Sequence, residues 1–157
     1  MRSIKITLIM LLLAVAASLA ALIYTGEERQ SILSRSPERG VVVINMTTRN
    51  WRFDPVVVQG HDGVEAWSKS RSEVFADTVI KVRLGDTVII NIENVEPNQP
   101  HGFGLEEFGI TSVVTPPRQV VTVRFVASKE GTYIFFCTVF CGTGHPLHRG
   151  TLIVSGG

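Results

Sequence analysis

The sequence has few of the residues that would build a disulfide-rich or a nucleic-acid-binding protein. Its 157 residues include only two cysteines and three methionines, too few cysteines for a disulfide framework. Positive charge exceeds negative charge by only one, because 15 lysines and arginines stand against 14 aspartates and glutamates. A nucleic-acid-binding surface needs a basic excess. The composition therefore predicts no nucleic-acid partner.

Long hydrophobic runs are also scarce, with one exception near the start of the chain. Residues 6–24 carry no charge, and as a helix they are long enough to span a hydrocarbon core of about 30 Å. Arg2 and Lys5 precede the run, which predicts that this end stays inside the cell and the rest is exported. We therefore predict one transmembrane helix within residues 1–24, in a plasma-membrane protein whose following domain faces outward. The alternative is a signal peptide cleaved before Ala21, which would export the same domain.

The remaining chain divides into a polar tether and one β-domain. Residues 25–40 are polar and charged, and we interpret them as the tether. Beyond them, apolar and polar residues alternate with the period of a half-buried strand. Strands are predicted in this way over residues 41–46, 56–58, 79–84, 87–93, 120–126, 131–136 and 151–154. Seven or eight short strands without a helical period predict an all-β Greek-key sandwich or barrel over residues 41–157.

Both cysteines and two of the four histidines fall in one segment, residues 137–148, between two predicted strands. Thiolates and imidazoles together suit copper or zinc, and a Greek-key topology could bring His101 beside this segment. The residues leave three possibilities: a copper site, a Cys2His2 zinc site, or a disulfide between Cys137 and Cys141. A disulfide that closes so small a loop stabilises little, and structural zinc is typical of domains that lack a core. The pattern therefore favours copper.

The segment resembles the dinuclear CuA domain of subunit II of haem-copper cytochrome oxidases. The resemblance rests on the pattern C-x3-C-G-x-G-H-x2-H at residues 137–148, on the strand residues 150–154, and on Pro-His-Gly-Phe at residues 100–103. It covers residues 79–154 well and residues 41–60 loosely. The chain looks most like the short form with a single N-terminal transmembrane helix, and the CuA domain of nitrous-oxide reductases is a more distant match. The resemblance implies a cupredoxin-like fold.

The resemblance also implies a copper centre of two ions bridged by both cysteine sulfurs. His101 and His145 would each bind one of the two ions, and the backbone carbonyl of Val139 would be a weak further ligand. The position of the family's axial methionine is occupied by His148, which is either a stronger axial ligand or a side chain turned outward. The ligands expected on this basis are His101, Cys137, Val139, Cys141, His145 and His148.

Nothing in the sequence predicts a catalytic centre in this chain. It offers no general base or nucleophile arranged for catalysis, and Phe103, Phe136 and Phe140 flank the expected ligands. We expect these rings to shield the site from water, which suits an electron relay. The resemblance implies a small exported electron donor, such as a cytochrome c or a cupredoxin. The acceptor would be a haem-copper oxidase subunit I or a related terminal reductase.

Three features depart from the family pattern. They are His148, Val139 in place of a glutamate found in many members, and residues 61–77, which have no counterpart in the compact short form. We expect residues 61–77 to form a long loop or a short helix across the sheet. These departures favour an alternative function, a free-standing membrane-anchored copper-binding module that acts as a chaperone, sensor or electron carrier outside an oxidase.

Overall fold

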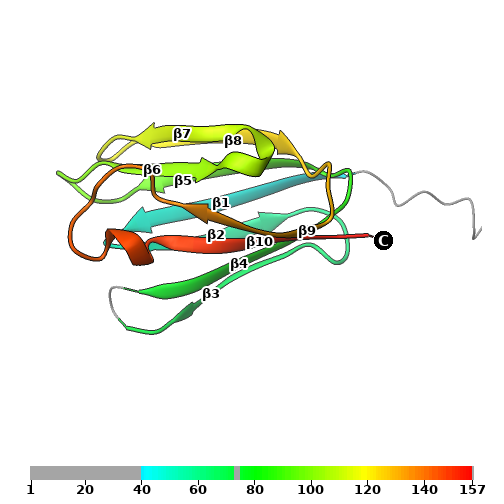
Figure 1. Ribbon diagram of the computed structural model, residues 1–157, viewed down its shortest axis with the longest axis horizontal. Coiled ribbons are helices and arrows are strands. Elements are labelled where there is room, and N and C mark those ends of the chain that lie inside the picture. Colours follow the sequence, from blue (N-terminus) through cyan, green and yellow to red (C-terminus); the bar gives the residue numbers. More distant parts are fainter. Residues whose placement is uncertain (1–39, 73–74, 157) are drawn as a thin grey trace, which may run out of the picture. The chain divides into compact units, whose positions relative to one another are not determined.

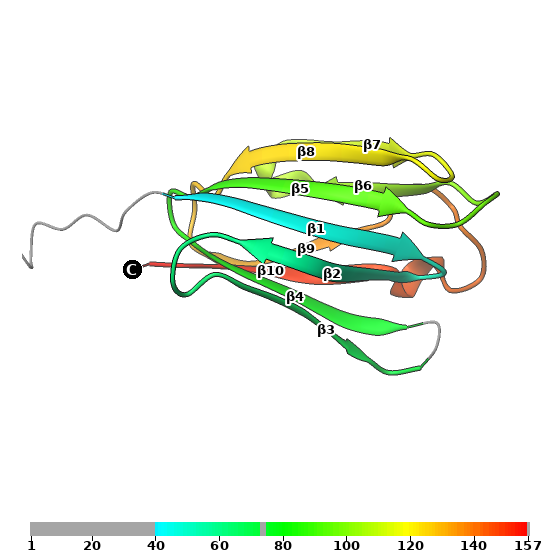
Figure 2. The same cartoon turned by 180° about the vertical axis from the view of Figure 1, so that it is seen from behind.

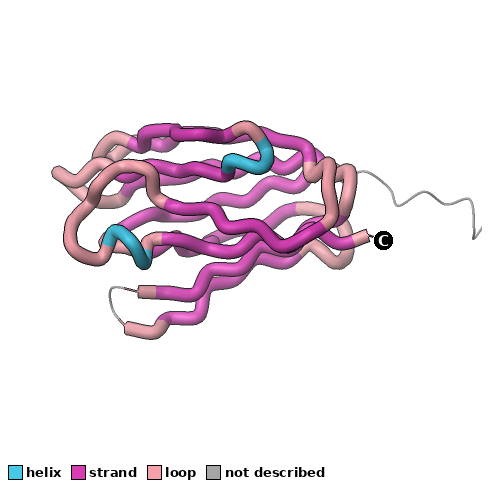
Figure 3. Tube along the Cα trace, viewed as in Figure 1, coloured by secondary structure: helices cyan, strands magenta, loops and turns pink. Residues whose placement is uncertain are grey.

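The computed structural model describes residues 40–72 and 75–156, which form an all-β domain. Its elements are β1 (Val41–Arg49), β2 (Arg52–Gln59), β3 (Glu65–Ser70), β4 (Ala76–Arg83), β5 (Thr87–Asn94), β6 (His101–Leu105), η1 (Glu106–Phe108), β7 (Ile110–Thr115), β8 (Val120–Val126), β9 (Gly131–Phe136), η2 (His145–Leu147) and β10 (Arg149–Ser155). The two short 3-10 helices are the only helical parts of this domain (Figure 3). The predicted anchor, residues 1–24, and all but the last residue of the tether lie outside the described residues. Within the described ranges, no helix is long and apolar enough to cross a membrane.

The strands form two sheets that pack face to face. One sheet has four strands in the order β2-β1-β5-β8, and the other has six in the order β3-β4-β10-β9-β6-β7. Figure 1 shows the six-stranded sheet in front, and Figure 2 shows the four-stranded sheet in front. Two neighbouring pairs, β1 with β5 and β4 with β10, are parallel, and the other pairs are antiparallel. The predicted all-β sandwich is therefore confirmed.

One apolar core fills the space between the sheets. In β5, Val88, Ile90 and Ile92 are buried, as expected for residues spaced by two on one face of a strand. The core also contains three fully buried phenylalanines, Phe53, Phe103 and Phe135, whose ring centroids lie 5.5 to 5.8 Å apart. Burying one such side chain contributes about 1.5–3 kcal/mol, so these rings give the neighbouring loops a firm base.

The expected ligands lie at one end of the sandwich, where three loops meet. The β1–β2 turn, the β5–β6 loop and the β9–β10 loop all lie at the left of Figure 1. They meet because β6 and β9 are antiparallel neighbours, so the start of β6 lies beside the end of β9. This arrangement brings His101 to the segment that holds both cysteines.

We expected residues 61–77 to form a long loop or a short helix across the sheet, and this prediction was wrong. Within this range Glu65–Ser70 form β3, and Ala76 begins β4; the two strands pair antiparallel, with Glu65 opposite Lys81 and Ser70 opposite Ala76. The strand pattern was hidden because β3 is an edge strand whose residues are at most half-buried. Even Trp67 is 39% exposed, and the ammonium of Lys81 lies 4.9 Å from the centre of its ring.

Strands β6 and β7 were not among the predicted strands either. Gly102 and Gly104 interrupt the β6 pattern, and both are needed for a close approach of the β9–β10 loop. A Cβ atom on Gly102 would overlap the Thr138 hydroxyl, and one on Gly104 would lie 2.7 Å from Thr138 Cγ2. The two glycines therefore let the loop of the cysteines lie directly on β6.

Candidate metal centre

The β9–β10 loop, residues 137–148, holds both cysteines in the interior of the domain. The Cys137 N–H donates to the His148 carbonyl at 2.9 Å, which closes the loop at its base. Both cysteines are buried and neither forms a disulfide. Their Sγ atoms are 3.8 Å apart, well beyond the S–S bond length of about 2.05 Å. The two sulfurs therefore face the same space without being bonded to each other.

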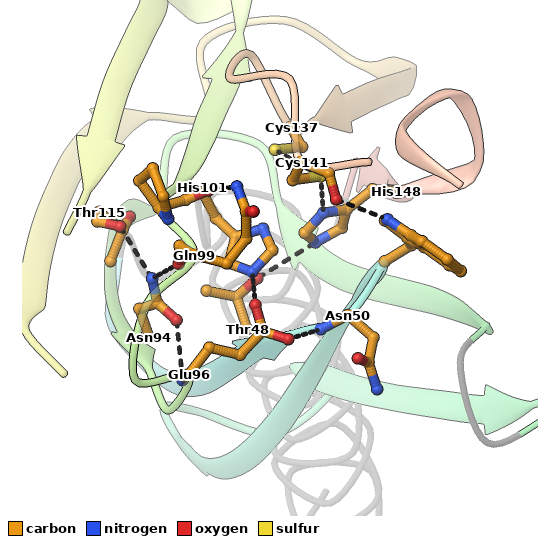
Figure 4. A network of polar contacts seen from close by, with 12 residues as sticks. Thr48, Asn50, Asn94, Glu96, Gln99, His101, Thr115, Cys137, Cys141 and His148 are labelled. Atoms are coloured by element: carbon orange, nitrogen blue, oxygen red, sulfur yellow. Dashed lines mark hydrogen bonds and ion pairs between the residues drawn. The ribbon is translucent and has the colours of Figure 1, made fainter. Parts of the chain in front are cut away.

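Two buried histidines complete a cluster with these sulfurs (Figure 4). One ligand atom from each of His101, Cys137, Cys141 and His148 lies within 4.8 Å of the others. The first residue of β6, His101, is 0% exposed, and its Nδ1 has no hydrogen bond. A buried polar atom without a partner is costly, and a metal ion would satisfy it.

His148 lies on the opposite side of the cluster from solvent. It is 1% exposed, and its Nδ1 lies 3.6 Å from Cys141 Sγ. Its ring packs against Phe53, with centroids 4.2 Å apart. The side chain therefore points into the cluster, and the outward orientation left open by the sequence does not occur.

The two remaining expected ligands contact the same pair of sulfurs from the outer side. The half-buried His145 has its Nδ1 3.5 Å from Cys141 Sγ, and the Val139 carbonyl oxygen lies 3.2 Å from Cys137 Sγ. The structure therefore places the four other expected ligands around the sulfurs of Cys137 and Cys141. These four ligands form two groups. The inner group is His101 and His148, and the outer group is His145 and the Val139 carbonyl.

Hydrogen bonds hold the far nitrogens of both inner histidines. His101 Nε2 lies 2.6 Å from Glu96 Oε2, and His148 Nε2 lies 3.1 Å from Thr48 Oγ1. The backbone N–H of Gly102 donates to Cys137 Sγ at 3.3 Å. These contacts leave the Nδ1 atoms of both rings directed toward the sulfurs, as ligands to a shared metal centre must be.

The four groups of the inner cluster shift one another's pKa values. Burial raises the pKa of Cys137, but interactions with the nearby imidazoles of His101 and His148 outweigh it and lower that pKa to about 4. Burial and the charge of Cys137 raise the pKa of Cys141 to about 12. Burial lowers the pKa of His148. Burial also opposes the charged form of His101, but interactions with Cys137 and Glu96 outweigh it and raise the pKa of His101. A metal ion that binds both sulfurs must therefore displace the Cys141 proton.

Sequence reasoning missed Glu96, Thr48 and a tryptophan beside the site. The indole N–H of Trp51 donates to the Cys141 carbonyl at 2.9 Å, and its ring stacks on Phe75 with centroids 5.5 Å apart. No local motif marks these residues. Thr48 and Trp51 reach the ligand loop from a distant part of the chain, and Glu96 reaches His101 only because of the course of the β5–β6 loop.

The expectation that three phenylalanines shield the ligands holds only in part. Phe103 is fully buried beneath the site, and Phe136 is half-buried. Phe140, in contrast, is 75% exposed. It turns outward because the cysteines that flank it in the loop turn inward. On the inner side of the site, Phe53 packs on the His148 ring, and Phe103 packs on Phe53.

Soft sulfur donors combined with imidazoles suit copper, and the free Nδ1 of His101 fits a metal ligand. The fold and the donor set together define a cupredoxin-like β-sandwich with a buried cysteine–histidine cluster.

Comparisons with known proteins agree with this class. No protein-family model matches the chain. Over 101 residues the chain is 29% identical to the nitrous-oxide reductase of Stutzerimonas stutzeri, an alignment that covers 63% of this chain and 15% of that protein. Over 75 residues it is 35% identical to cytochrome c oxidase subunit 2 of Thermus thermophilus, covering 48% of this chain and 53% of that protein. The chain thus spans only about half, or less, of the length of these relatives.

A solved structure supports the fold. The periplasmic domain of subunit II of cytochrome oxidase from Bradyrhizobium japonicum aligns with a TM-score of 0.56 at 16% identity, covering 73% of this chain and 84% of that chain. The chain is therefore related in sequence to subunit II of cytochrome c oxidase and to nitrous-oxide reductase. The family resemblance inferred from residues 100–103 and 137–148 is confirmed.

Proposed function

We propose that this domain binds two copper ions between its paired sulfurs and transfers electrons. The observation that carries the proposal is the sulfur pair, 3.8 Å apart, with imidazole nitrogens on two sides. The inner ion would be held by His101 and His148, and the outer ion by His145 and the Val139 carbonyl. Both ions would share Cys137 and Cys141.

Copper supplies the one-electron carrier, and the chain keeps its ligands in place. The Cys137 N–H to His148 carbonyl bond fixes the two ends of the ligand loop relative to each other. The buried rings of Phe53 and Phe103 exclude water from the inner side. A ligand set held this firmly changes little between redox states, which favours rapid electron transfer.

The partners proposed for this function come from the relatives. An exported redox protein, such as a cytochrome c or a cupredoxin, would supply electrons. A haem-copper oxidase subunit I or a related terminal reductase would accept them. A neighbouring gene for such a subunit would support this assignment, whereas neighbouring copper-transport genes would support a role outside an oxidase.

A second function, that of a free-standing copper-binding module, is favoured by one specific observation. The four inner donors lie within 4.8 Å of one another, close enough for a single ion to use all four. Such a site would carry or sense one copper ion and would leave His145 unbound.

Metal stoichiometry separates the two functions. The copper-loaded protein should contain two copper ions per chain, and its electron paramagnetic resonance (EPR) spectrum should show hyperfine coupling to two nuclei. One ion per chain with coupling to a single nucleus would refute the dinuclear centre and support the second function.

We also propose that residues 1–24 anchor the protein in the plasma membrane, with the β-domain outside. Arg2 and Lys5 ahead of the apolar run support this orientation. The full-length protein should remain in the membrane fraction at high salt, and external protease should reach the β-domain. A soluble protein that begins near Ala21 would instead identify the segment as a cleaved signal peptide.

A further inference from the structure

The β5–β6 loop places a carboxylate against the outer nitrogen of His101. Glu96 Oε2 lies 2.6 Å from His101 Nε2, with the Glu96 side chain 20% exposed and that of His101 fully buried. The second carboxylate oxygen of Glu96 accepts the backbone N–H of Asn50 at 2.8 Å. Both oxygens are therefore engaged, and the carboxylate cannot rotate away without losing a hydrogen bond.

The backbone around Glu96 is held as firmly as its side chain (Figure 4). The fully buried Asn94 accepts the Glu96 N–H at 3.0 Å. Its amide nitrogen donates to the carbonyls of Gln99 and Thr115 at 2.8 and 3.0 Å. Asn94 thus connects the loop to the end of β7 and fixes where Glu96 meets the imidazole.

The contact with Glu96 selects which nitrogen of His101 can bind a metal. A carboxylate only accepts hydrogen bonds, so His101 Nε2 must carry the proton. The lone pair of the neutral ring is then on Nδ1, which faces the cluster and has no hydrogen bond. Hydrogen bonds to a charged partner are roughly twice as strong as neutral ones.

The two inner histidines differ in the group that contacts Nε2 of the imidazole. His148 is supported at Nε2 by the neutral hydroxyl of Thr48 at 3.1 Å, whereas His101 is supported by a negative charge. A carboxylate behind a ligating imidazole raises the basicity of the ligand. His101 is therefore the more strongly donating imidazole of the inner pair.

We propose that Glu96 is a positioning residue that fixes His101 with Nδ1 toward copper and makes it a stronger donor than His148. The inference rests on the proposed copper function. Its consequence is a tighter site with a lower reduction potential, because the negative charge favours the more positive, oxidised state of the metal.

The first test compares Glu96→Gln and Glu96→Ala in the full-length protein, with the exposed Glu93→Gln as the matched control. Glu96→Ala should weaken copper binding by about 10- to 100-fold. Glu96→Gln keeps a hydrogen-bond acceptor but removes the charge, so it should raise the reduction potential. A tenfold loss of preference for the oxidised state corresponds to about 59 mV for a one-electron couple. Parent-like affinity and potential in both Glu96 variants would overturn the proposal, as would an equal change in Glu93→Gln.

The second test needs no copper, so it separates this inference from the proposed function. Long-range 1H–15N spectra of the metal-free protein at alkaline pH should show His101 protonated at Nε2, with slow exchange of that proton. Glu96→Gln should keep this tautomer, and Glu96→Ala should lose the slow exchange while remaining folded at the temperature of the measurement. A proton on Nδ1 in the parent would overturn the inference. Failure of the parent to bind copper would instead refute the proposed function, and the imidazole spectra would still decide the role of Glu96.

Discussion

Replacing Gly144 with alanine should disturb the ligand loop through one side chain, Trp51. The backbone of Gly144 has φ −87° and ψ 2°, which alanine adopts without strain. A Cβ atom there would overlap Trp51 Cδ2 and Cε3 and would lie 2.7 Å from Cε2. Trp51 must therefore move, although it is held by the Cys141 carbonyl at 2.9 Å and by the ring of Phe75.

The size of this effect follows from the contacts that Trp51 would lose. The hydrogen bond to Cys141 contributes about 0.5–1.5 kcal/mol, and the stacking on Phe75 adds a similar amount, about 0.5–1.5 kcal/mol. Gly144→Ala should therefore lower the free energy of unfolding of the metal-free protein by about 1–3 kcal/mol, which is also the usual cost of overpacking. Denaturant titration measures the loss, and a shift in tryptophan fluorescence should accompany it.

A double-mutant cycle with Trp51→Ala tests the reasoning. If the indole is the only obstacle, Gly144→Ala should change the stability of the Trp51→Ala protein by less than about 0.5 kcal/mol. An equal loss of stability in both backgrounds would refute the argument, because the added methyl group would then disturb something other than Trp51.

Two further predictions concern histidines. His148→Met replaces an imidazole with a softer thioether and removes the bond to Thr48. We therefore expect a higher reduction potential and more even sharing of the unpaired electron between the two copper ions, with unchanged copper content. An EPR spectrum and a reduction potential equal to the parent's would contradict ligation by His148. The pKa of His61 is raised, mainly by its hydrogen bond to the Asp62 carbonyl and then by the buried Asp86. The stabilisation from His61 should therefore be complete below the unfolded-state pKa of about 6.5 and be lost as the pH rises through the raised folded value. The difference in melting temperature between the parent and His61→Asn checks this, and a difference independent of pH would contradict it.

The sequence predicts those strands whose two faces differ in environment. Residues 120–126 and 131–136 match the bounds of β8 and β9, and the buried alternation of β5 follows the expected pattern. Strand β3 escapes prediction because an edge strand has little buried surface to impose a pattern. Strand β6 escapes because the packing of another loop requires glycine where a strand would otherwise carry larger side chains.

For the site, the spacing of the cysteines and histidines within one loop indicates the chemistry, but it cannot indicate the supporting contacts. Thr48 lies 100 residues from His148 in sequence, and the bond between them depends on how the two sheets pack. Glu96 is only five residues from His101, yet its direction depends on the bonds that Asn94 makes to β7 and the β5–β6 loop. Such contacts depend on the whole fold, so a local pattern does not reveal them.

The position of β10 sets the order in which this site can be assembled. It lies in the middle of the six-stranded sheet, between β4 and β9, although it follows both in sequence. Before residues 149–155 have been synthesised, β3 and β4 cannot join β9, β6 and β7, and the base of the ligand loop has no strand to close on. Pairing of such distant segments is slow. A nascent chain that already displays both cysteines therefore lacks the closed base of the ligand loop, and we expect metal insertion to follow completion of the sheet.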